Sequence, residues 1–186
     1  MPKADKEPIV KEKPCFTPSG ILAEYSNKLN GVVLKFTEPI DAAPPSLETW
    51  GLYPFKGDEA MKSVTLRTVD GLTSAFLLGR DAKVAHVHLD EYSCSSQHAV
   101  IQFRKKLKII ELTAEEQIAR GTFETFMQEF TIVPYLMDLD STNGTFLNGE
   151  KVEGAKYIEL RSKDVLKFGT NPVEYVFMKQ KDSDDD

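Results

Sequence analysis

The chain has 186 residues, a formal net charge of −6, 41% hydrophobic residues and 28% charged residues, which is typical of a soluble protein of one domain with extensions. The negative charge argues against nucleic-acid binding through a broad basic face, and no apolar run is long enough to span a membrane. The two cysteines, Cys15 and Cys94, lie far apart in the sequence, which favours a reducing compartment over a disulfide framework.

Residues 1–46 are predicted to form an N-terminal arm with two parts. The first 14 residues are rich in Lys, Glu and Pro and lack the apolar stretch of a signal peptide, so we expect them to be disordered. From Phe16 to Pro39, apolar residues occur without a sustained period. Such a segment cannot build its own core, so it either packs on the main domain or docks on a partner. The sequence DAAPPS (41–46) then indicates a turn or linker.

Residues 47–180 are predicted to form one all-β domain. In AVIQFR (99–104), an apolar set of residues alternates with a mixed set, which is typical of a half-buried strand. Many short runs of this kind, with little helical pattern between them, predict a β-sandwich or barrel. The predicted strands are Gly51–Phe55, Val64–Arg67, Ala75–Leu78, Val84–Leu89, Ala99–Arg104, Tyr135–Leu139, Thr145–Leu147, Tyr157–Leu160, Val165–Phe168 and Glu174–Met178.

An insertion at 105–133 interrupts the strand pattern and is predicted to be partly helical. Thr113 and Glu116 have the spacing of a helix capping box, and apolar residues then recur at roughly helical spacing as far as Phe130, although Gly121 weakens the pattern. We expect the apolar side either to pack on the sandwich or to bind a partner. The basic residues at 105, 106 and 108 are interpreted as a solvated loop rather than an RNA contact.

The C-terminal residues 181–186 are acidic and are expected to be solvated. Ser183 precedes three aspartates and is therefore a candidate phosphorylation site for a kinase that prefers acidic sequences.

Polar residues gather in three loops that follow or precede predicted strands. They are Gly79-Arg80, Ser95-Ser96-Gln97-His98 and Thr142-Asn143-Gly144-Thr145. Together they offer hydroxyl and amide hydrogen-bond donors and one fixed positive charge, which suits an oxyanion such as phosphate. A second Asn-Gly pair, Asn148-Gly149, lies between two short runs and predicts a two-residue type I′ turn.

The three stretches in this order resemble the forkhead-associated (FHA) domain, a β-sandwich that recognises phosphothreonine peptides. The resemblance covers roughly residues 50–179. It implies that Arg80 and Ser95 contact the phosphate, that Ser96 and Thr142 lie beside it, and that Asn143 holds the main chain of the bound peptide. It also implies a structural role for the motif residues Gly79, His98 and Gly144. Because relatives often carry a cation or Asn at the position of Ser96, we expect modest affinity or a dependence on another tether.

A narrower resemblance extends beyond the FHA domain into residues 14–56. The stretches FTPSGILAEYSNKLNGVVLKFTEP and WGLYPFKGDE are similar to the family of Smad nuclear-interacting proteins and yeast pre-mRNA leakage proteins, subunits of the spliceosomal retention-and-splicing (RES) complex. This resemblance implies a non-enzymatic nuclear protein that acts in pre-mRNA splicing, touches RNA only indirectly and has neither cofactor nor membrane association. It also implies that the N-terminal segment binds the RNA-recognition-motif subunit of the complex. The residues expected to make that contact are Phe16, Pro18, Ser19, Gly20, Ile21 and Leu22.

Three other interpretations of the sequence are a scaffold subunit, a hydrolase and a metal site. A constitutive scaffold subunit whose FHA pocket does not bind phosphate stays open, because Ser96 replaces a cation. A hydrolase that uses Ser95 and His98 lacks a nucleophile elbow or oxyanion motif. A metal site at His86 and His88 lacks a matching group of Cys or carboxylate ligands.

Overall fold

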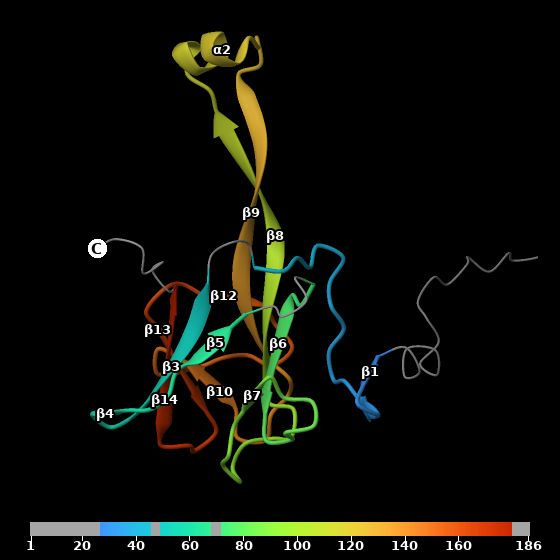
Figure 1. The fold of residues 1–186 in the computed structure, drawn as a ribbon, viewed down its shortest axis with the longest axis vertical. Helices are drawn as coiled ribbons and strands as arrows, with labels where there is room; N and C mark the ends of the chain where they lie inside the picture. The colour runs from blue at the N-terminus through green and yellow to red at the C-terminus, as the bar shows by residue number, and fades with distance from the viewer. Residues whose placement is uncertain (1–26, 46–48, 68–71, 180–186) are drawn as a thin grey trace, which may run out of the picture.

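The structure is a computed structural model, which describes residues 27–45, 49–67 and 72–179. Two β-sheets pack face to face, and a long hairpin projects from one of them (Figure 1). The expected partner-docking residues 16–22 and the acidic tail at 181–186, with Ser183, lie outside the described residues.

Both sheets are mostly antiparallel, which confirms the predicted all-β sandwich. The first has the order β11 (Glu150–Lys151), β10 (Thr145–Leu147), β13 (Asp164–Phe168), β14 (Val173–Lys179), β3 (Trp50–Lys56) and β4 (Glu59–Ala60), with β5 (Val64–Leu66) also paired to β3. The second has the order β12 (Ile158–Glu159), β9 (Phe126–Asp138), β8 (Ala99–Glu111), β6 (Ala75–Gly79) and β7 (Val87–His88). A small hairpin, β1 (Lys28–Leu29) with β2 (Val32–Val33), precedes both sheets.

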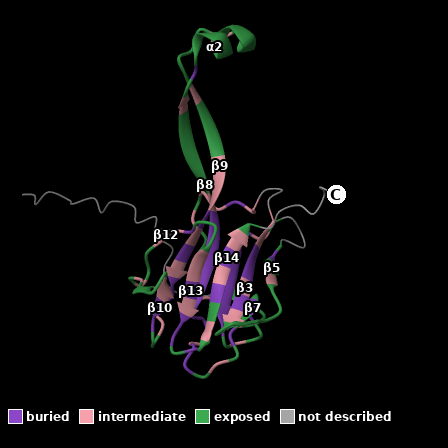
Figure 2. Cartoon of the chain, turned by 90° about the vertical axis from the view of Figure 1, so that its left-hand side faces the viewer, coloured by how far each residue is buried: buried purple, intermediate pink, exposed green. Residues whose placement is uncertain are grey.

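The main core lies between the two sheets. Strand alternation sends one set of side chains inward, and the largest fully buried ones are Phe103, Phe168, Phe177, Leu52, Leu66, Leu78, Ile101, Leu136 and Leu166. Trp50 stacks on Phe177 at a centroid distance of 4.7 Å and so closes one edge of this core. The buried bands of the strands are visible in Figure 2.

A second, smaller core covers the outer face of the β6–β8–β9 sheet. There, Phe36 packs with Leu77, Val100 and Leu139, and the partly buried Leu34 lies against the same cluster. Part of the predicted docking segment therefore packs on its own domain.

The end of this N-terminal segment is held at the base of β8. The Ala43 N–H donates to the Phe103 carbonyl at 3.1 Å, and Arg104 makes two bonds of 3.0 and 2.9 Å to the Asp41 carboxylate. The Arg104 guanidinium also lies over the Tyr157 ring, 4.6 Å from its centroid. The hydrogen bond from Arg104 holds the pKa of the Asp41 carboxyl below its usual value. The end of the N-terminal segment therefore packs on the β-domain.

Replacing Phe36 with alanine should lower the free energy of unfolding by about 3 kcal/mol, since the ring is 8% exposed and closes the second core. Urea denaturation would measure this change. Val33→Ala is the control, because that side chain on the same segment is 41% exposed and its loss should cost less than about 0.5 kcal/mol. Equal midpoints for the two variants would mean that the segment does not stabilise the domain.

The insertion is partly helical, as predicted, but the helix is shorter than its apolar spacing indicated and most of the insertion is strand. Strand β8 continues to Glu111 and β9 begins at Phe126, while the helix α2 covers only Ala114–Arg120. The predicted capping box is present at Thr113 and Glu116. The helix ends at Gly121, whose φ of 63° is a left-handed C-cap. The basic run at 105–108 lies on β8 rather than in a loop, and Lys106 pairs with Glu159 at 2.6 Å.

Candidate functional site

Strand register brings the three polar loops to one end of the sandwich. Leu78 on β6 lies opposite Ala99 on β8, which in turn lies opposite Asp138 on β9. The loop after β6, the loop before β8 and the loop after β9 therefore leave the sheet side by side. This end is opposite to the projecting hairpin, because β8 runs from this end to the hairpin (Figure 1).

The first two loops are joined through their main chains. The Arg80 N–H donates to the Ser95 carbonyl at 3.0 Å, and the Asp81 N–H donates to the Ser96 carbonyl at 3.1 Å. This approach requires glycine at position 79, because a Cβ there would lie 2.2 Å from the Ser96 carbonyl oxygen. The Gly-Arg motif thus sets Arg80 directly beside the two serines.

The third loop is joined to the second through side chains. The Ser95 Oγ accepts the Thr142 N–H at 3.1 Å, and the Asn143 Nδ2 donates to the Ser93 carbonyl at 2.7 Å. This bond uses one N–H of the Asn143 amide, so the Oδ1 and the second N–H take no part in it. Ser93 also accepts the Thr170 N–H at its Oγ, 3.2 Å away, so the β13–β14 loop joins the same end.

His98 forms a buried brace beneath the loops. Its ring is fully buried; the Nδ1 accepts the Ser95 N–H at 3.1 Å, and the Nε2 lies 3.1 Å from the Gly144 carbonyl. Because Nδ1 is an acceptor, the proton is assigned to Nε2, which donates to Gly144. The ring also packs edge-on against Phe168 at 5.5 Å. His98 therefore ties the serine loop to the Asn-Gly loop.

Asp138 forms a second brace, which the sequence analysis did not identify. Its Oδ1 accepts the Ser141 N–H at 2.9 Å, and its Oδ2 accepts the hydroxyls of Ser141 and Thr145 at 2.6 and 2.5 Å. The carboxylate is 4% exposed. The signal that could have revealed it is the spacing Asp-x-x-Ser, since an Asp that accepts from a following backbone N–H is common in turns.

The upper surface of these loops is open to a ligand. Arg80, Ser96, Thr142 and Asn143 are exposed, and Ser95 is partly exposed. Arg80 forms no ion pair with any of the described residues. Burial raises the pKa of the Cys94 thiol, and the positive charge of Arg80 opposes this increase. The structure thus brings together all five residues predicted to bind phosphate, although their role stays a prediction.

The second Asn-Gly pair lies apart from this surface. Asn148 and Gly149 connect β10 to β11 with φ angles of 52° and 86°. Positive φ at both central positions is what a type I′ turn requires.

The geometry does not favour hydrolytic or metal chemistry. Both ring nitrogens of His98 contact main-chain groups, whereas the Ser95 hydroxyl accepts from Thr142. His86 accepts the Leu77 N–H at 3.1 Å. Among residues 27–45, 49–67 and 72–179, no group of three His, Cys, Asp or Glu side chains could hold a metal ion. Within the same ranges, no helix is long and apolar enough to cross a membrane.

The burial of His98 predicts a pH dependence of stability. Burial is the main cause that lowers its pKa below 6.5, against weaker opposing effects of Gly144 and Asp138. Between pH 6.5 and the lowered pKa of the folded state, the unfolded chain binds a proton that the folded chain does not, so stability falls as the pH decreases through this range. The slope should approach 1.4 kcal/mol per pH unit, roughly one proton. Urea denaturation from pH 7.5 to 5.5 would measure it.

The His98→Gln variant serves as the control for this slope. His86 also has a pKa lowered mainly by burial, and its contribution is common to both proteins. The difference in slope between parent and variant therefore reports His98 alone. Parallel pH profiles for the two proteins would show that His98 is not the group responsible.

Comparison with known proteins agrees with this geometry. The FHA domain family model matches residues 76–169, a range that holds all three loops. The chain belongs to the FHA-domain family. It is 32% identical over 206 residues to pre-mRNA leakage protein 1 of Saccharomyces cerevisiae, and the match covers 95% of this chain and 90% of the yeast protein. This confirms the resemblance to the family of Smad nuclear-interacting and pre-mRNA leakage proteins.

Two further matches extend the comparison. Smad nuclear interacting protein 1 of Rattus norvegicus is 43% identical over 175 residues, which cover 94% of this FHA protein and 40% of the rat protein. The chain thus spans less than half the length of that relative. A solved structure described as the yeast Pml1 splicing factor and its integration into the RES complex superposes with a TM-score of 0.59 and 31% identity. It covers 81% of this chain and all of the yeast chain.

Proposed function

We propose that this chain is a non-enzymatic subunit of a spliceosomal RES complex and that its FHA domain binds phosphothreonine peptides. The observation that carries the proposal is the convergence of Arg80, Ser95 and Asn143 at one end of the sandwich, on loops fixed by main-chain and side-chain hydrogen bonds. A preorganised site loses little conformational entropy when a ligand binds.

The chemistry of the exposed groups suits a phosphoryl group with two negative charges. Arg80 can donate two parallel N–H bonds to phosphate oxygens. The hydroxyls of Ser95, Ser96 and Thr142 can donate to the remaining oxygens. The free Oδ1 and N–H of Asn143 can pair with the main chain of the peptide, as a strand neighbour would.

Ser96 limits the expected affinity. A bond to a charged donor is worth about 1.5–3 kcal/mol, against about 0.5–1.5 for a neutral one. A hydroxyl in place of a cation therefore gives modest affinity unless a second contact tethers the ligand. A tether of this kind is expected for a subunit that is already held in a large assembly, because the local concentration of the ligand is then high.

The splicing assignment is supported by the relatives. The yeast relative is named for pre-mRNA leakage, and the solved structure is described as that of a splicing factor and its integration into the RES complex. By analogy, the segment that carries Phe16, Ile21 and Leu22 binds an RNA-recognition-motif subunit, the protein acts in the nucleus, and RNA is contacted only through partners.

Titration calorimetry with a phosphothreonine peptide library tests the phosphate site. Peptides with phosphothreonine should bind the full chain, while the same peptides with unmodified threonine or phosphoserine should bind at least about tenfold more weakly. No binding at millimolar peptide would refute the site and favour a constitutive scaffold subunit.

Co-purification from nuclear extract tests the complex assignment independently. An RNA-recognition-motif protein should be recovered with the full chain and lost when residues 1–26 are deleted, because those residues carry the expected docking segment. Retention of that protein after the deletion, or its absence from the full-chain sample, would contradict the assignment without affecting the phosphate site.

A further inference from the structure

The hairpin made by residues 105–132, here called the arm, exposes an apolar stripe. Leu107 on β8 lies opposite Phe130 on β9, and Ile109 lies opposite Gln128. These pairs share one face of the ribbon, because side chains alternate along each strand. Leu107 is 47% exposed, and Ile109 and Phe130 are both 64% exposed. Figure 2 shows the exposed class over most of the arm, in contrast to the buried bands of the sandwich.

The apolar alternation of the core is interrupted by the exposed Lys105 and resumes in this arm. Ile101 and Phe103 point inward between the sheets, and the same alternate positions on β8 carry Leu107 and Ile109. The opposing sheet ends before the arm begins (Figure 1). An isolated two-stranded ribbon is at best marginally stable in water, and adjoining exposed apolar side chains usually mark an interaction site. The arm therefore has the pattern of a surface that a partner covers.

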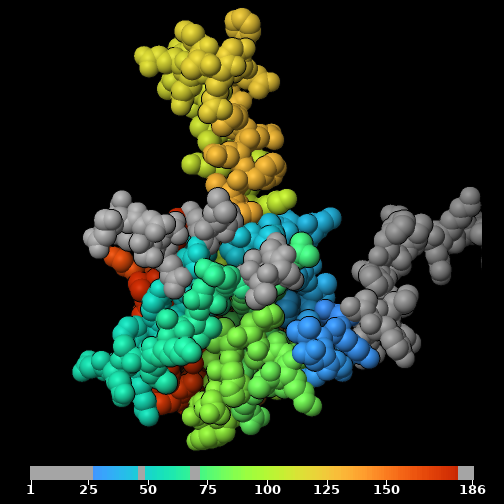
Figure 3. Space-filling model, viewed as in Figure 1, coloured from blue at the N-terminus to red at the C-terminus, as the bar shows by residue number. Residues whose placement is uncertain are grey.

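The tip of the arm adds a hollow to this stripe. The helix α2 has a complete capping box and a glycine C-cap, yet it buries none of its residues. A hollow of about 480 Å³ lies between the helix and Phe123. Ile118 and Phe123, two of its lining residues, are 81% and 102% exposed. Figure 3 shows the tip standing clear of the rest of the molecule.

The charges around the hollow are predominantly negative. Residues 111–130 contain five glutamates, no lysine and a single arginine, Arg120, whose guanidinium contacts the Met127 sulfur at 3.0 Å. Glu116 is engaged in the helix cap, and the other four glutamates are exposed. A basic partner complements this rim. A second copy of the tip would bring like charges together, and a nucleic acid would be repelled.

We propose that the arm tip docks a basic segment of a partner protein, which inserts an apolar side chain into the hollow between α2 and Phe123. The apolar stripe along Leu107, Ile109 and Phe130 extends the contact toward the sandwich. This surface is independent of the phosphate site. The 13 residues of β8 span the distance between them, roughly 44 Å at about 3.4 Å per residue.

A designed peptide tests the proposal on the full chain. The probe is a fluorescein-labelled 18-residue helix of leucine and lysine with one apolar face, and fluorescence anisotropy reports its binding. Ile118→Ser/Phe123→Ser should weaken binding at least tenfold, as should the charge reversal Glu115→Lys/Glu124→Lys. The matched control Ile40→Ser/Tyr92→Ser removes equally exposed side chains elsewhere and should bind as the parent does.

Several results would overturn the proposal. They are no binding of the leucine–lysine peptide, equal binding by the Ile118→Ser/Phe123→Ser variant, or equal binding of a leucine–glutamate or serine–lysine peptide. Sedimentation velocity tests whether a second copy of the chain occupies the hollow instead. If the chain alone forms a dimer that the Ile118→Ser/Phe123→Ser variant abolishes, the occupant is a second copy and not a basic partner.

Discussion

The Arg80→Ala protein is expected to bind a phosphothreonine peptide at least about 30-fold more weakly than the parent and to keep its fold. Each charge-assisted bond to phosphate contributes about 1.5–3 kcal/mol, so the loss of two such bonds exceeds the roughly 2 kcal/mol that corresponds to 30-fold in affinity. The fold should be unaffected, because Arg80 is exposed and its structural contact is made by its main-chain N–H to Ser95. Titration calorimetry and urea denaturation would measure the two effects.

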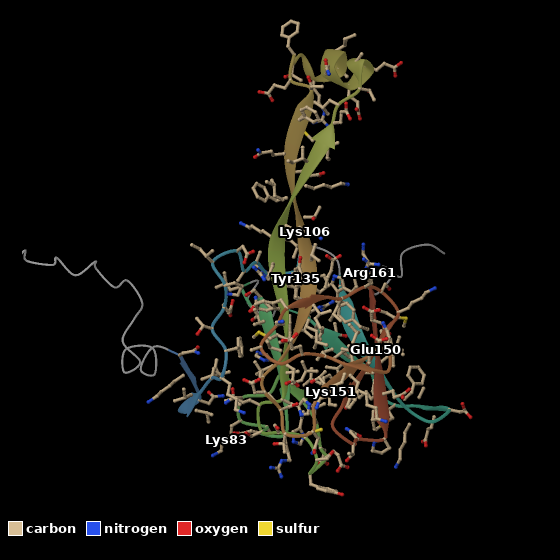
Figure 4. All side chains as sticks on the ribbon, turned by 180° about the vertical axis from the view of Figure 1, so that it is seen from behind. Lys83, Lys106, Tyr135, Glu150, Lys151 and Arg161 are labelled. Carbon is tan, nitrogen blue, oxygen red and sulfur yellow. The ribbon has the colours of Figure 1, made fainter. Side chains whose placement is uncertain are left out.

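Two variants make this test specific. Arg80→Lys keeps the charge but loses the planar fork of donors, so its affinity should lie between those of parent and alanine variant. Arg161→Ala removes the same charge from an exposed arginine at the arm side of the sandwich (Figure 4) and should bind as the parent does. Equal losses of affinity in Arg80→Ala and Arg161→Ala would show that net charge alone causes the effect. No loss in Arg80→Ala would refute the proposed contact.

The sequence could predict where the site lies, because its motifs occur at strand ends. The end of one strand and the start of an antiparallel neighbour lie at the same edge of a sheet, so the sequence predicts that Ser95, before the strand at 99–104, lies near Thr142 and Asn143, after the strand at 135–139. Alternation alone does not place Arg80 there, because the predicted strand at 84–89 lies between Arg80 and Ser95; only the resemblance to the FHA domain joins them. In the structure they meet because β6 pairs directly with β8, while the short β7 runs parallel to β6.

The arm could not be predicted from spacing alone. Phe126 and Phe130 are four residues apart, and this interval places side chains on one face of either a helix or a strand. Two features make residues 126–130 a strand instead of a helix. Gly121 ends α2 in the left-handed conformation, and β9 pairs with all 13 residues of β8. Such pairing is a long-range interaction that no local pattern contains.

Short strands and buried braces were also beyond the sequence pattern. Strands β4 and β11 have two residues each, too few to show alternation. Of the predicted strand at 84–89, only Val87–His88 form a strand, because the residues at its start form a turn in which the Val84 N–H donates to the Asp81 carbonyl. Asp138 lies within the predicted strand Tyr135–Leu139, and its spacing to Ser141 is the one local signal of its role; its bond to Thr145 is evident only from the folded loop.

The two proposed binding surfaces lie at opposite ends of β8, so one chain can engage two partners without competition. The base of the arm is where the sandwich ends, and Figure 4 shows Lys106 and Tyr135 in this region. Tyr135 and Tyr157 both lie against the Arg104 guanidinium, at 5.4 and 4.6 Å. This cluster packs where β8 and β9 leave the sandwich to form the arm.

Replacing Asp138 with alanine is expected to lower the free energy of unfolding by about 3–5 kcal/mol. Its carboxylate accepts three hydrogen bonds from Ser141 and Thr145, and bonds to a charged group contribute about 1.5–3 kcal/mol each. The Thr145 hydroxyl is fully buried, so the alanine leaves a donor without a partner. Urea denaturation at pH 7 would measure the loss.

The same substitution should weaken phosphopeptide binding in the fraction that remains folded. Thr142 and Asn143 lie between the two residues that Asp138 holds, so the loop that carries them loses both of its anchors. A looser loop has to be ordered when the peptide binds, and this ordering reduces affinity. Calorimetry below the unfolding transition would report this effect separately from stability.

Two comparisons decide whether Asp138 acts as this brace. Asp140→Asn removes a charge from an exposed neighbour and should change stability by less than about 0.5 kcal/mol. Thr145→Val removes one of the three donors and should cost about 1–2 kcal/mol. Because the two residues share a bond, the Asp138→Ala/Thr145→Val double variant should lose less than the sum of the single changes. Full additivity, or an Asp138→Ala protein as stable as Asp140→Asn, would show that the carboxylate does not hold the loop.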